Sequence, residues 1–174
     1  MSTPPLTLEN YWWVAQAELE SWVNFCARGL AAPSVEVRFA PEGRGVEPLT
    51  QAELTLLEWF FAHEEAASTA VQHAILAAYP EIQAGFGFEG EDGQELLPDI
   101  STTEGLRSLI SLQSVNVHQV SHNGVPYLGF ELSCTWDQEH GLGVLMHGTR
   151  VVEVGGADTA VLLWLAERDA KRHG

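Results

Sequence analysis

The most regular alternation of hydrophobic and polar residues lies between Tyr127 and Gly156. One side of an extended chain would carry the apolar residues of the first run, Leu128, Phe130, Leu132, Cys134 and Trp136. Alternation with a period of two residues is typical of a half-buried strand. A polar turn at 137–141 and a second reversal near Gly148 separate this run from two others, 142–146 and 151–154. The stretch therefore predicts an antiparallel meander of three strands.

A helix is predicted to begin after Thr50. Thr50 and Glu53 have the spacing of a capping box, in which each side chain accepts a hydrogen bond from the other residue's backbone N–H. Apolar residues follow at helical spacing, namely Leu54, Leu57, Phe60 and Phe61. A break is expected near His63. A second apolar stripe over 67–78 is expected to end at Pro80, because proline removes a helical hydrogen bond.

The segment 12–26 is compatible with two structures. A helix would place on one stripe Trp12, Leu19, Trp22, Val23 and Cys26. A strand would place on one face Trp13, Ala15, Ala17 and Leu19. Intrinsic propensities do not decide, because Ala, Glu and Gln favour a helix while Trp, Tyr and Val favour a strand. The segment 34–40 alternates more clearly and predicts a strand.

Between residues 85 and 105 the sequence becomes acidic and rich in glycine. Six carboxylates occur there without a basic residue, namely Glu89, Glu91, Asp92, Glu95, Asp99 and Glu104. This composition predicts a long solvent-exposed loop. A capping-box spacing at Ser101–Glu104 predicts a short helix over 104–110. A strand over 113–120 should then follow.

Asn123-Gly124 predicts a hairpin turn that leads into the meander, because both residues tolerate positive φ. After the meander, Asp158 lies where a helix N-terminus favours a carboxylate. The stripe of this closing helix would consist of Val161, Leu162, Trp164 and Leu165. The elements together predict an α+β fold, in which an antiparallel sheet carries the helical pair and the C-terminal helix on one face. We expect one domain over residues 1–174, with a loose N-terminus at 1–10.

The charge of the chain restricts its partners. Twenty-four acidic residues against eight basic ones give a net charge of −16, and Lys171 is the sole lysine. A field of this sign repels nucleic-acid phosphates and anionic lipid surfaces, so we exclude both as partners. A basic protein partner would be attracted. Acidity that serves solubility alone is the alternative interpretation.

The sequence suits a cytoplasmic protein. No apolar run approaches the roughly 20 residues that span a bilayer, and Met1–Pro5 lacks the features of a signal peptide. Cys26 and Cys134 lie in apolar patterns without a CxxC spacing. We therefore expect two buried free thiols and no disulfide.

Asp137, Glu139 and His140 form a tight cluster of titratable residues in the first turn of the meander. Carboxylates and an imidazole in one turn could bind a divalent metal, which makes a metal-dependent hydrolase the alternative function. Further ligands would have to converge from His118, His122, His147 or Asp158. We favour a structural interpretation, in which Asp137 caps the turn and the other two bond to loop backbone. No metal or cofactor is expected.

Residues 136–158, WDQEHGLGVLMHGTRVVEVGGAD, resemble the signature of a family of uncharacterised bacterial domains. That signature is Trp-Asp-x-Glu-His-Gly-x-Gly-Val, followed by a valine-rich strand and Gly-Gly-x-Asp. The resemblance extends to an opening strand that ends near Ser21-Trp22 and to a second helix that ends at a tyrosine such as Tyr79. It implies a strand over 12–20. It also implies similarity to small immunity or accessory proteins that accompany polymorphic toxins.

These observations lead to the hypothesis of a non-enzymatic acidic protein-binding domain, an immunity-type protein that neutralises a basic toxin. An acidic loop offered to a cationic cleft gains electrostatic steering and charge-assisted hydrogen bonds. The candidate binding residues are Glu89, Glu91, Asp92, Glu95, Phe86 and Phe88. The candidate motif turn consists of Trp136, Asp137, Glu139, His140 and Gly141.

Overall fold

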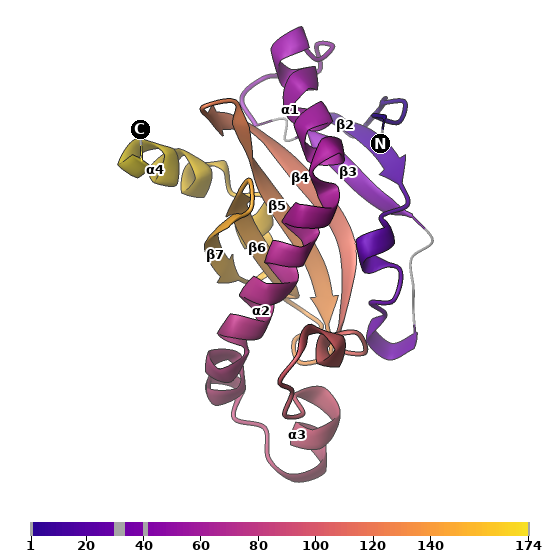
Figure 1. Cartoon of the computed structure of the whole chain (residues 1–174), viewed down its shortest axis with the longest axis vertical. Coiled ribbons are helices and arrows are strands. Elements are labelled where there is room, and N and C mark those ends of the chain that lie inside the picture. Colours follow the sequence, from indigo (N-terminus) through magenta and orange to yellow (C-terminus); the bar gives the residue numbers. More distant parts are fainter. Residues whose placement is uncertain (1, 30–33, 40–41, 174) are drawn as a thin grey trace.

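The computed structural model describes residues 2–29, 34–39 and 42–173 (Figure 1). The strands are β1 (Thr7–Glu9), β2 (Trp12–Ala17), β3 (Val35–Phe39), β4 (Ile110–His122), β5 (Val125–Cys134), β6 (Leu142–His147) and β7 (Arg150–Gly155). The α-helices are α1 (Gln51–Ala62), α2 (Glu64–Phe86), α3 (Gly90–Leu96) and α4 (Leu163–His173). Short 3₁₀ helices are η1 (Glu20–Trp22), η2 (Ala27–Gly29), η3 (Thr103–Leu106) and η4 (Ala157–Ala160). The predicted α+β class is confirmed.

The seven strands form one sheet in the order β1-β2-β3-β4-β5-β6-β7. Neighbouring strands are antiparallel except β3 and β4, which are parallel with Val37 opposite Val115. A parallel pair requires a long crossover connection, and α1, α2 and α3 lie within it. Figure 1 shows α2 running across the sheet. The main hydrophobic core includes side chains of α1, α2 and the sheet.

The predicted meander is confirmed. β5 pairs with β6 and β6 with β7, so that Phe130, Val144 and Val154 lie side by side across three strands. All five apolar residues predicted to face inward from the first run are buried, Trp136 to 5% exposure. The Asn123-Gly124 turn is also confirmed, with φ of 53° and 76°. β4 is longer than the predicted 113–120 because Leu109, Ile110 and Leu112 are buried in the core as well.

The N-terminal segments are strands. The choice of strand within 12–20 is confirmed by β2, which ends at Ala17. The prediction of a loose N-terminus at 1–10 is wrong for Thr7–Glu9, because this segment pairs with β2. The turn between them uses Asn10 and Tyr11 at φ of 48° and 72°, a pair without the glycine that marks most such turns. β3 confirms the strand predicted at 34–40, whose last residue lies outside the described residues.

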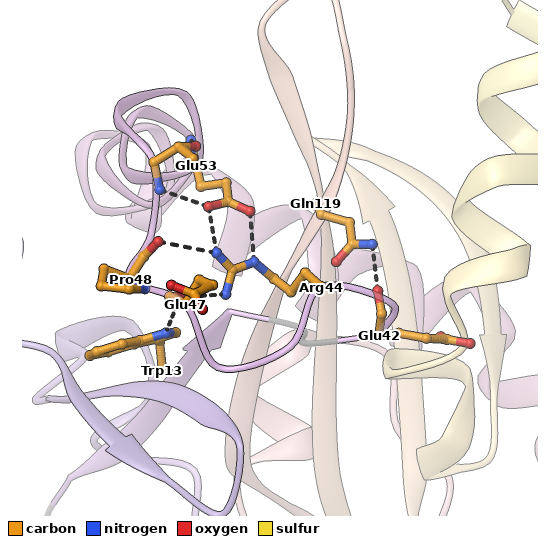
Figure 2. Close-up of polar contacts among 8 residues, drawn as sticks. Trp13, Glu42, Arg44, Glu47, Pro48, Glu53 and Gln119 are labelled. Atoms are coloured by element: carbon orange, nitrogen blue, oxygen red, sulfur yellow. Dashed lines mark hydrogen bonds and ion pairs between the residues drawn. The ribbon is translucent and has the colours of Figure 1, made fainter.

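Helix α1 begins at the predicted capping box, which an arginine reinforces (Figure 2). Thr50 N–H donates to Glu53 Oε2 at 2.8 Å, and Glu53 N–H donates to Thr50 Oγ1 at 3.3 Å. The guanidinium of Arg44 forms two further bonds with the Glu53 carboxylate, at 2.8 and 2.9 Å. Arg44 also donates to the carbonyl of Glu47, which accepts a second bond from the Trp13 indole. These bonds join the loop, β2 and the helix start.

The predicted break near His63 is confirmed, but the predicted end of the second helix at Pro80 is wrong. α2 continues through Pro80 to Phe86 and stops at Gly87, whose φ is 60°. Pro80 lies on the exposed side of the helix. Proline has no N–H to donate to the carbonyl four residues earlier, but Tyr79 and Ile82 on either side of it continue to pack against the core.

The long acidic loop predicted at 85–105 is also wrong. The segment contains the last turn of α2, helix α3 and the start of η3. Ser101–Glu104 does not start the predicted helix over 104–110. The side chain of Thr102, the residue before η3, makes no capping hydrogen bond, and the chain enters β4 at Ile110.

The expectation that all helices pack on one face of the sheet is wrong for α4. Leu165 and Ala166 of this helix form a second, smaller core with Tyr127 and Leu145. Tyr127 precedes Leu128, which belongs to the main core, and successive strand residues point to opposite faces. α4 therefore covers the face opposite to α2. It begins after η4, which contains Asp158, and Trp164 is 52% exposed instead of completing its apolar stripe.

Glycine in β5 permits this arrangement. A Cβ atom on Gly129 would lie 1.7 Å from the carbonyl oxygen of Ala160 in η4. Only glycine allows a backbone to approach a strand this closely. η4 can therefore rest on the sheet and direct the chain into α4.

A buried carboxylate fastens α4 to the sheet. Asp169 accepts a hydrogen bond from Tyr127 Oη at 2.7 Å and one from Arg150 Nη1 at 3.3 Å. Burial alone would raise the pKa of Asp169, but the hydrogen bonds from Arg150 and Tyr127 outweigh it and hold the pKa below its ordinary value of 3.8. The charged form is therefore the one that stabilises the fold.

Asp169→Asn should reduce the free energy of unfolding at pH 7 by about 1.5–3 kcal/mol, the range of hydrogen bonds to a charged group. Because the folded pKa is lowered, this contribution is present above pH 3.8 and is lost as the pH falls through the folded value. Urea titrations at pH 7 and pH 3 should show a smaller difference from the native chain at pH 3. Glu167→Gln, on an exposed position of the same helix, is the control. An equal deficit at both pH values would contradict the assignment.

Candidate functional site

One predicted binding residue, Phe86, and three residues of the predicted motif turn, Trp136, Asp137 and Gly141, line one groove. An open cavity of about 330 Å³ lies between the C-terminal half of α2 and the ends of β6 and β7. The α2 wall consists of Ala78, Glu81, Ile82, Gly85 and Phe86. The opposite wall consists of Trp136, Asp137, Gly141, Leu142, Val154, Gly155 and Gly156. The groove thus joins part of the predicted binding segment to the predicted motif turn.

An exposed aromatic pair lies at the α2 end of the groove. Phe86 is 42% exposed and Phe88 is 37% exposed. Their rings are stacked, with centroids 5.7 Å apart and planes inclined by 22°. Gly87, in the left-handed conformation, ends α2 between them. Large apolar side chains exposed together in this way are typical of binding surfaces.

Helix α3 holds the predicted acidic residues in a fixed position next to this pair. Glu89, Glu91, Asp92 and Glu95 are all exposed. The chain that follows α3 is tied to α2, because Tyr79 Oη donates to the carbonyl of Pro98 at 2.7 Å and Gln83 Nε2 donates to that of Leu97 at 3.1 Å. Thr135 Oγ1 donates to the carbonyl of Leu96 at 2.7 Å. The carboxylates are therefore presented by an anchored element (Figure 1).

Trp136 is the buried link between the two walls. Its ring lies edge-on to that of Tyr79, with centroids 6.0 Å apart and an interplanar angle of 82°. Burial, together with the nearby carboxylate of Asp99, raises the pKa of Tyr79 to about 12. The phenol is therefore protonated at neutral pH and can donate to Pro98 as described.

The motif turn uses its polar groups to hold its own backbone. Asp137 Oδ1 accepts the backbone N–H of His140 at 2.9 Å, and the Asp137 carbonyl accepts that of Gly141 at 3.0 Å. Gly141 has φ of 64°, and a Cβ there would lie 2.9 Å from the Leu132 carbonyl oxygen. Glu139 is exposed, and the His140 side chain is 72% exposed. The imidazole lies 3.2 Å from Asp137 Oδ1 instead of bonding to loop backbone.

The other histidines do not converge on this turn. His118 is fully buried and contacts the Ala160 carbonyl through Nε2 at 2.9 Å, and burial lowers its pKa. His147 stacks on Tyr127 near α4, and its pKa is lowered, chiefly by burial. Within residues 2–29, 34–39 and 42–173, no three His, Cys, Asp or Glu residues are grouped so that they could hold a metal ion. The described part of the chain therefore offers no ligand set for the alternative hydrolase.

Cys26 and Cys134 are both free cysteines. Cys134 is buried, and burial raises its pKa to about 11, which keeps the thiol protonated. Cys26 is only partly buried, so the expectation of two buried thiols is wrong for this residue. In the portions of the chain with described coordinates, no helix has the length and apolar content needed to cross a membrane.

Several residues that build the groove were not predicted. Glu81 and Ile82 line it, and Gln83 and Thr135 tether α3. A helical spacing of three to four residues does continue past Pro80, through Ile75, Tyr79, Ile82 and Phe86. That spacing was the available signal for a longer α2. Nothing local to Thr135 indicates its partner, which lies 39 positions away.

Trp136→Ala should lower the free energy of unfolding by about 3–5 kcal/mol, because it removes a buried aromatic ring between α2 and the meander. Trp164→Ala is the matched control and should cost less than about 1 kcal/mol, since Trp164 is half exposed. Urea denaturation of both variants measures the difference. Equal losses would show that Trp136 has no special role in joining the two walls.

Chelation should leave the protein unchanged. We expect EDTA to leave the melting temperature unaltered, and elemental analysis to find less than one equivalent of zinc or manganese. His140→Ala should not alter either result. Stoichiometric metal that is lost in this variant would instead support the metal-dependent hydrolase, because metal binding to a folded site contributes to stability.

Comparisons with known proteins give one match. The model of a family described as "Domain of unknown function (DUF6985)" matches residues 6–162. No curated protein and no solved structure matches the chain. The matched residues include the whole sheet, α1 to α3 and the groove, and α4 follows them.

Proposed function

We propose that this chain, which belongs to the DUF6985 family, is a non-enzymatic acidic protein-binding domain that neutralises a basic partner protein. The observation that carries the proposal is the exposed Phe86–Phe88 pair beside the carboxylates of α3. Aromatic anchors supply most of the binding free energy in many protein interfaces, and charged residues around them set specificity. The groove region offers both in one place.

The carboxylates support the choice of a basic partner. Glu91, Asp92 and Glu95 are exposed on one short helix, and the whole chain carries a net charge of −16. Such a surface repels acidic proteins and attracts cationic ones from a distance. Because α3 and the chain after it are tethered to α2 and to Thr135, which follows β5, little ordering of the backbone is needed on binding, which favours affinity.

A basic toxin is the specific partner that we propose. The resemblance of residues 136–158 to domains similar to toxin-associated immunity proteins supports this choice. Toxins that act on nucleic acids have cationic clefts for phosphate, and an acidic helix placed in such a cleft would block it. On this account the chain inactivates its partner by occupying a surface and needs no chemistry of its own.

The proposal is tested with the product of the gene immediately upstream. We expect the two proteins to co-purify. The association and dissociation rates of their complex can then be measured by surface plasmon resonance at low salt. The triple variant Glu91→Gln, Asp92→Asn, Glu95→Gln should slow association by roughly tenfold, because it removes the steering charges. Glu18→Gln, Glu58→Gln, Glu167→Gln changes the net charge equally at exposed sites elsewhere and should have less than a twofold effect.

The aromatic pair should affect the dissociation rate. Phe86→Ala with Phe88→Ala should speed dissociation at least tenfold and leave association nearly unchanged, because apolar contacts form after the encounter. An upstream product that does not bind, or binding that is unaffected by the α3 triple variant at low salt, would refute the proposal.

A further inference from the structure

We infer that the groove between α2 and the motif turn receives a bulky apolar side chain of the partner, and that basic residues flank this side chain in the partner's sequence. This inference rests on the proposed function and adds to it the kind of segment that is recognised. It also assigns a binding role to the surface of the motif turn, in which Asp137 holds the turn's own backbone.

The walls of the groove suit an apolar side chain. Ile82 and Phe86 on α2 face Leu142 and Val154 across it. Glycine on the α2 wall leaves space at the groove, since Gly85 carries no side chain and an added Cβ there would have nothing within 4 Å. The volume of about 330 Å³ is at the small end of the roughly 300–1,000 Å³ typical of ligand pockets. A single inserted side chain is a better match than a large cofactor.

Carboxylates that line the groove favour positively charged residues on either side of the inserted side chain. Glu81 lies on the α2 wall and Asp137 on the turn, so each side of the groove has a carboxylate. Among the described residues that line it, none is Lys or Arg. The exposed carboxylates of α3 extend the negative surface from the Phe86 end. An apolar side chain between two basic residues would meet apolar walls and a carboxylate on either side.

The exposed aromatic pair gives such a segment a further contact. A guanidinium can stack on the face of an aromatic ring while its N–H groups bind carboxylates. Phe86 lines the groove and stacks on Phe88, and Glu89 follows directly in the chain. An arginine beside the inserted side chain therefore has both kinds of partner within this end of the groove.

Three synthetic peptides test the inference on the full chain by amide chemical-shift mapping. They are acetylated and amidated, with the sequences Gly-Arg-Leu-Arg-Gly, Gly-Arg-Gly-Arg-Gly and Gly-Glu-Leu-Glu-Gly. We expect the first to shift the amides of Gly85, Gly155 and Gly156 and to bind at least fivefold more tightly than the second. The third should not bind. A first peptide that binds no more tightly than the second, or that leaves the groove amides unshifted, would overturn the inference.

A filled groove provides the matched variant. Gly85→Leu should abolish the advantage of the leucine peptide and leave the binding of the Gly-Arg-Gly-Arg-Gly peptide unchanged. Gly85 lies in a helix with nothing within 4 Å of an added Cβ, so the variant should fold, as a thermal melt would verify. Ala84→Leu adds a similar side chain at the next exposed position, outside the lining residues, and should keep the advantage. An advantage that survives Gly85→Leu would overturn the inference.

The same variants separate this inference from the proposed function. If the leucine advantage is absent while the α3 triple variant slows association with the upstream product, the groove inference fails and the proposed function stands. If the leucine peptide binds in the groove but the upstream product does not bind the chain, the proposed function fails and the groove remains a site for basic apolar segments.

Discussion

The contact between Tyr79 and Trp136 is the constraint on which the functional end of the molecule depends. It joins the C-terminal half of α2 to the chain directly after β5, at residues 57 positions apart in the sequence. Two hydrogen bonds at this contact hold α3 and the chain after it. Tyr79 donates to the carbonyl of Pro98, and Thr135, next to Trp136, donates to that of Leu96. A segment whose composition resembles a solvated loop is thereby held as a helix at a fixed place. The carboxylates of this segment are held in one place for this reason.

The two faces of the sheet are stabilised by different means. α1 and α2 cover one face with a large apolar core that includes Leu57, Phe60 and Ile75. α4 covers part of the other face with few apolar contacts and relies on Asp169, which Tyr127 and Arg150 hold in its charged form. The close approach of η4 to Gly129 fixes where this second layer begins. Hydrophobic burial thus determines the position of α2, whereas a backbone contact and a buried charge determine that of α4.

The functional proposal follows from how apolar and charged groups are combined. Acidic residues occur over most of the chain, and alone they would attract any cation weakly. Near the end of α2 they surround exposed aromatic rings and an apolar groove, so that electrostatic attraction and hydrophobic contact act on the same partner. Family membership assigns neither a chemistry nor a partner. Of the polar residues in the motif turn, which suggest catalysis when seen in the sequence, Asp137 and His140 are engaged in the turn's own hydrogen bonds, and Glu139 is exposed.

The sequence by itself determined the elements that depend on local interactions. The meander follows from strict alternation in β5, the start of α1 from the Thr50–Glu53 capping box, and the hairpin from Asn123-Gly124, because each rule involves residues close together in the chain. Only the tertiary structure decided the rest. α2 continues past Pro80 because the core on its other side outweighs one lost hydrogen bond, α3 forms because distant side chains hold its end, and α4 lies on the second face because Gly129 admits η4. Each of these features depends on contacts between residues far apart in the sequence, so no local sequence pattern could predict it.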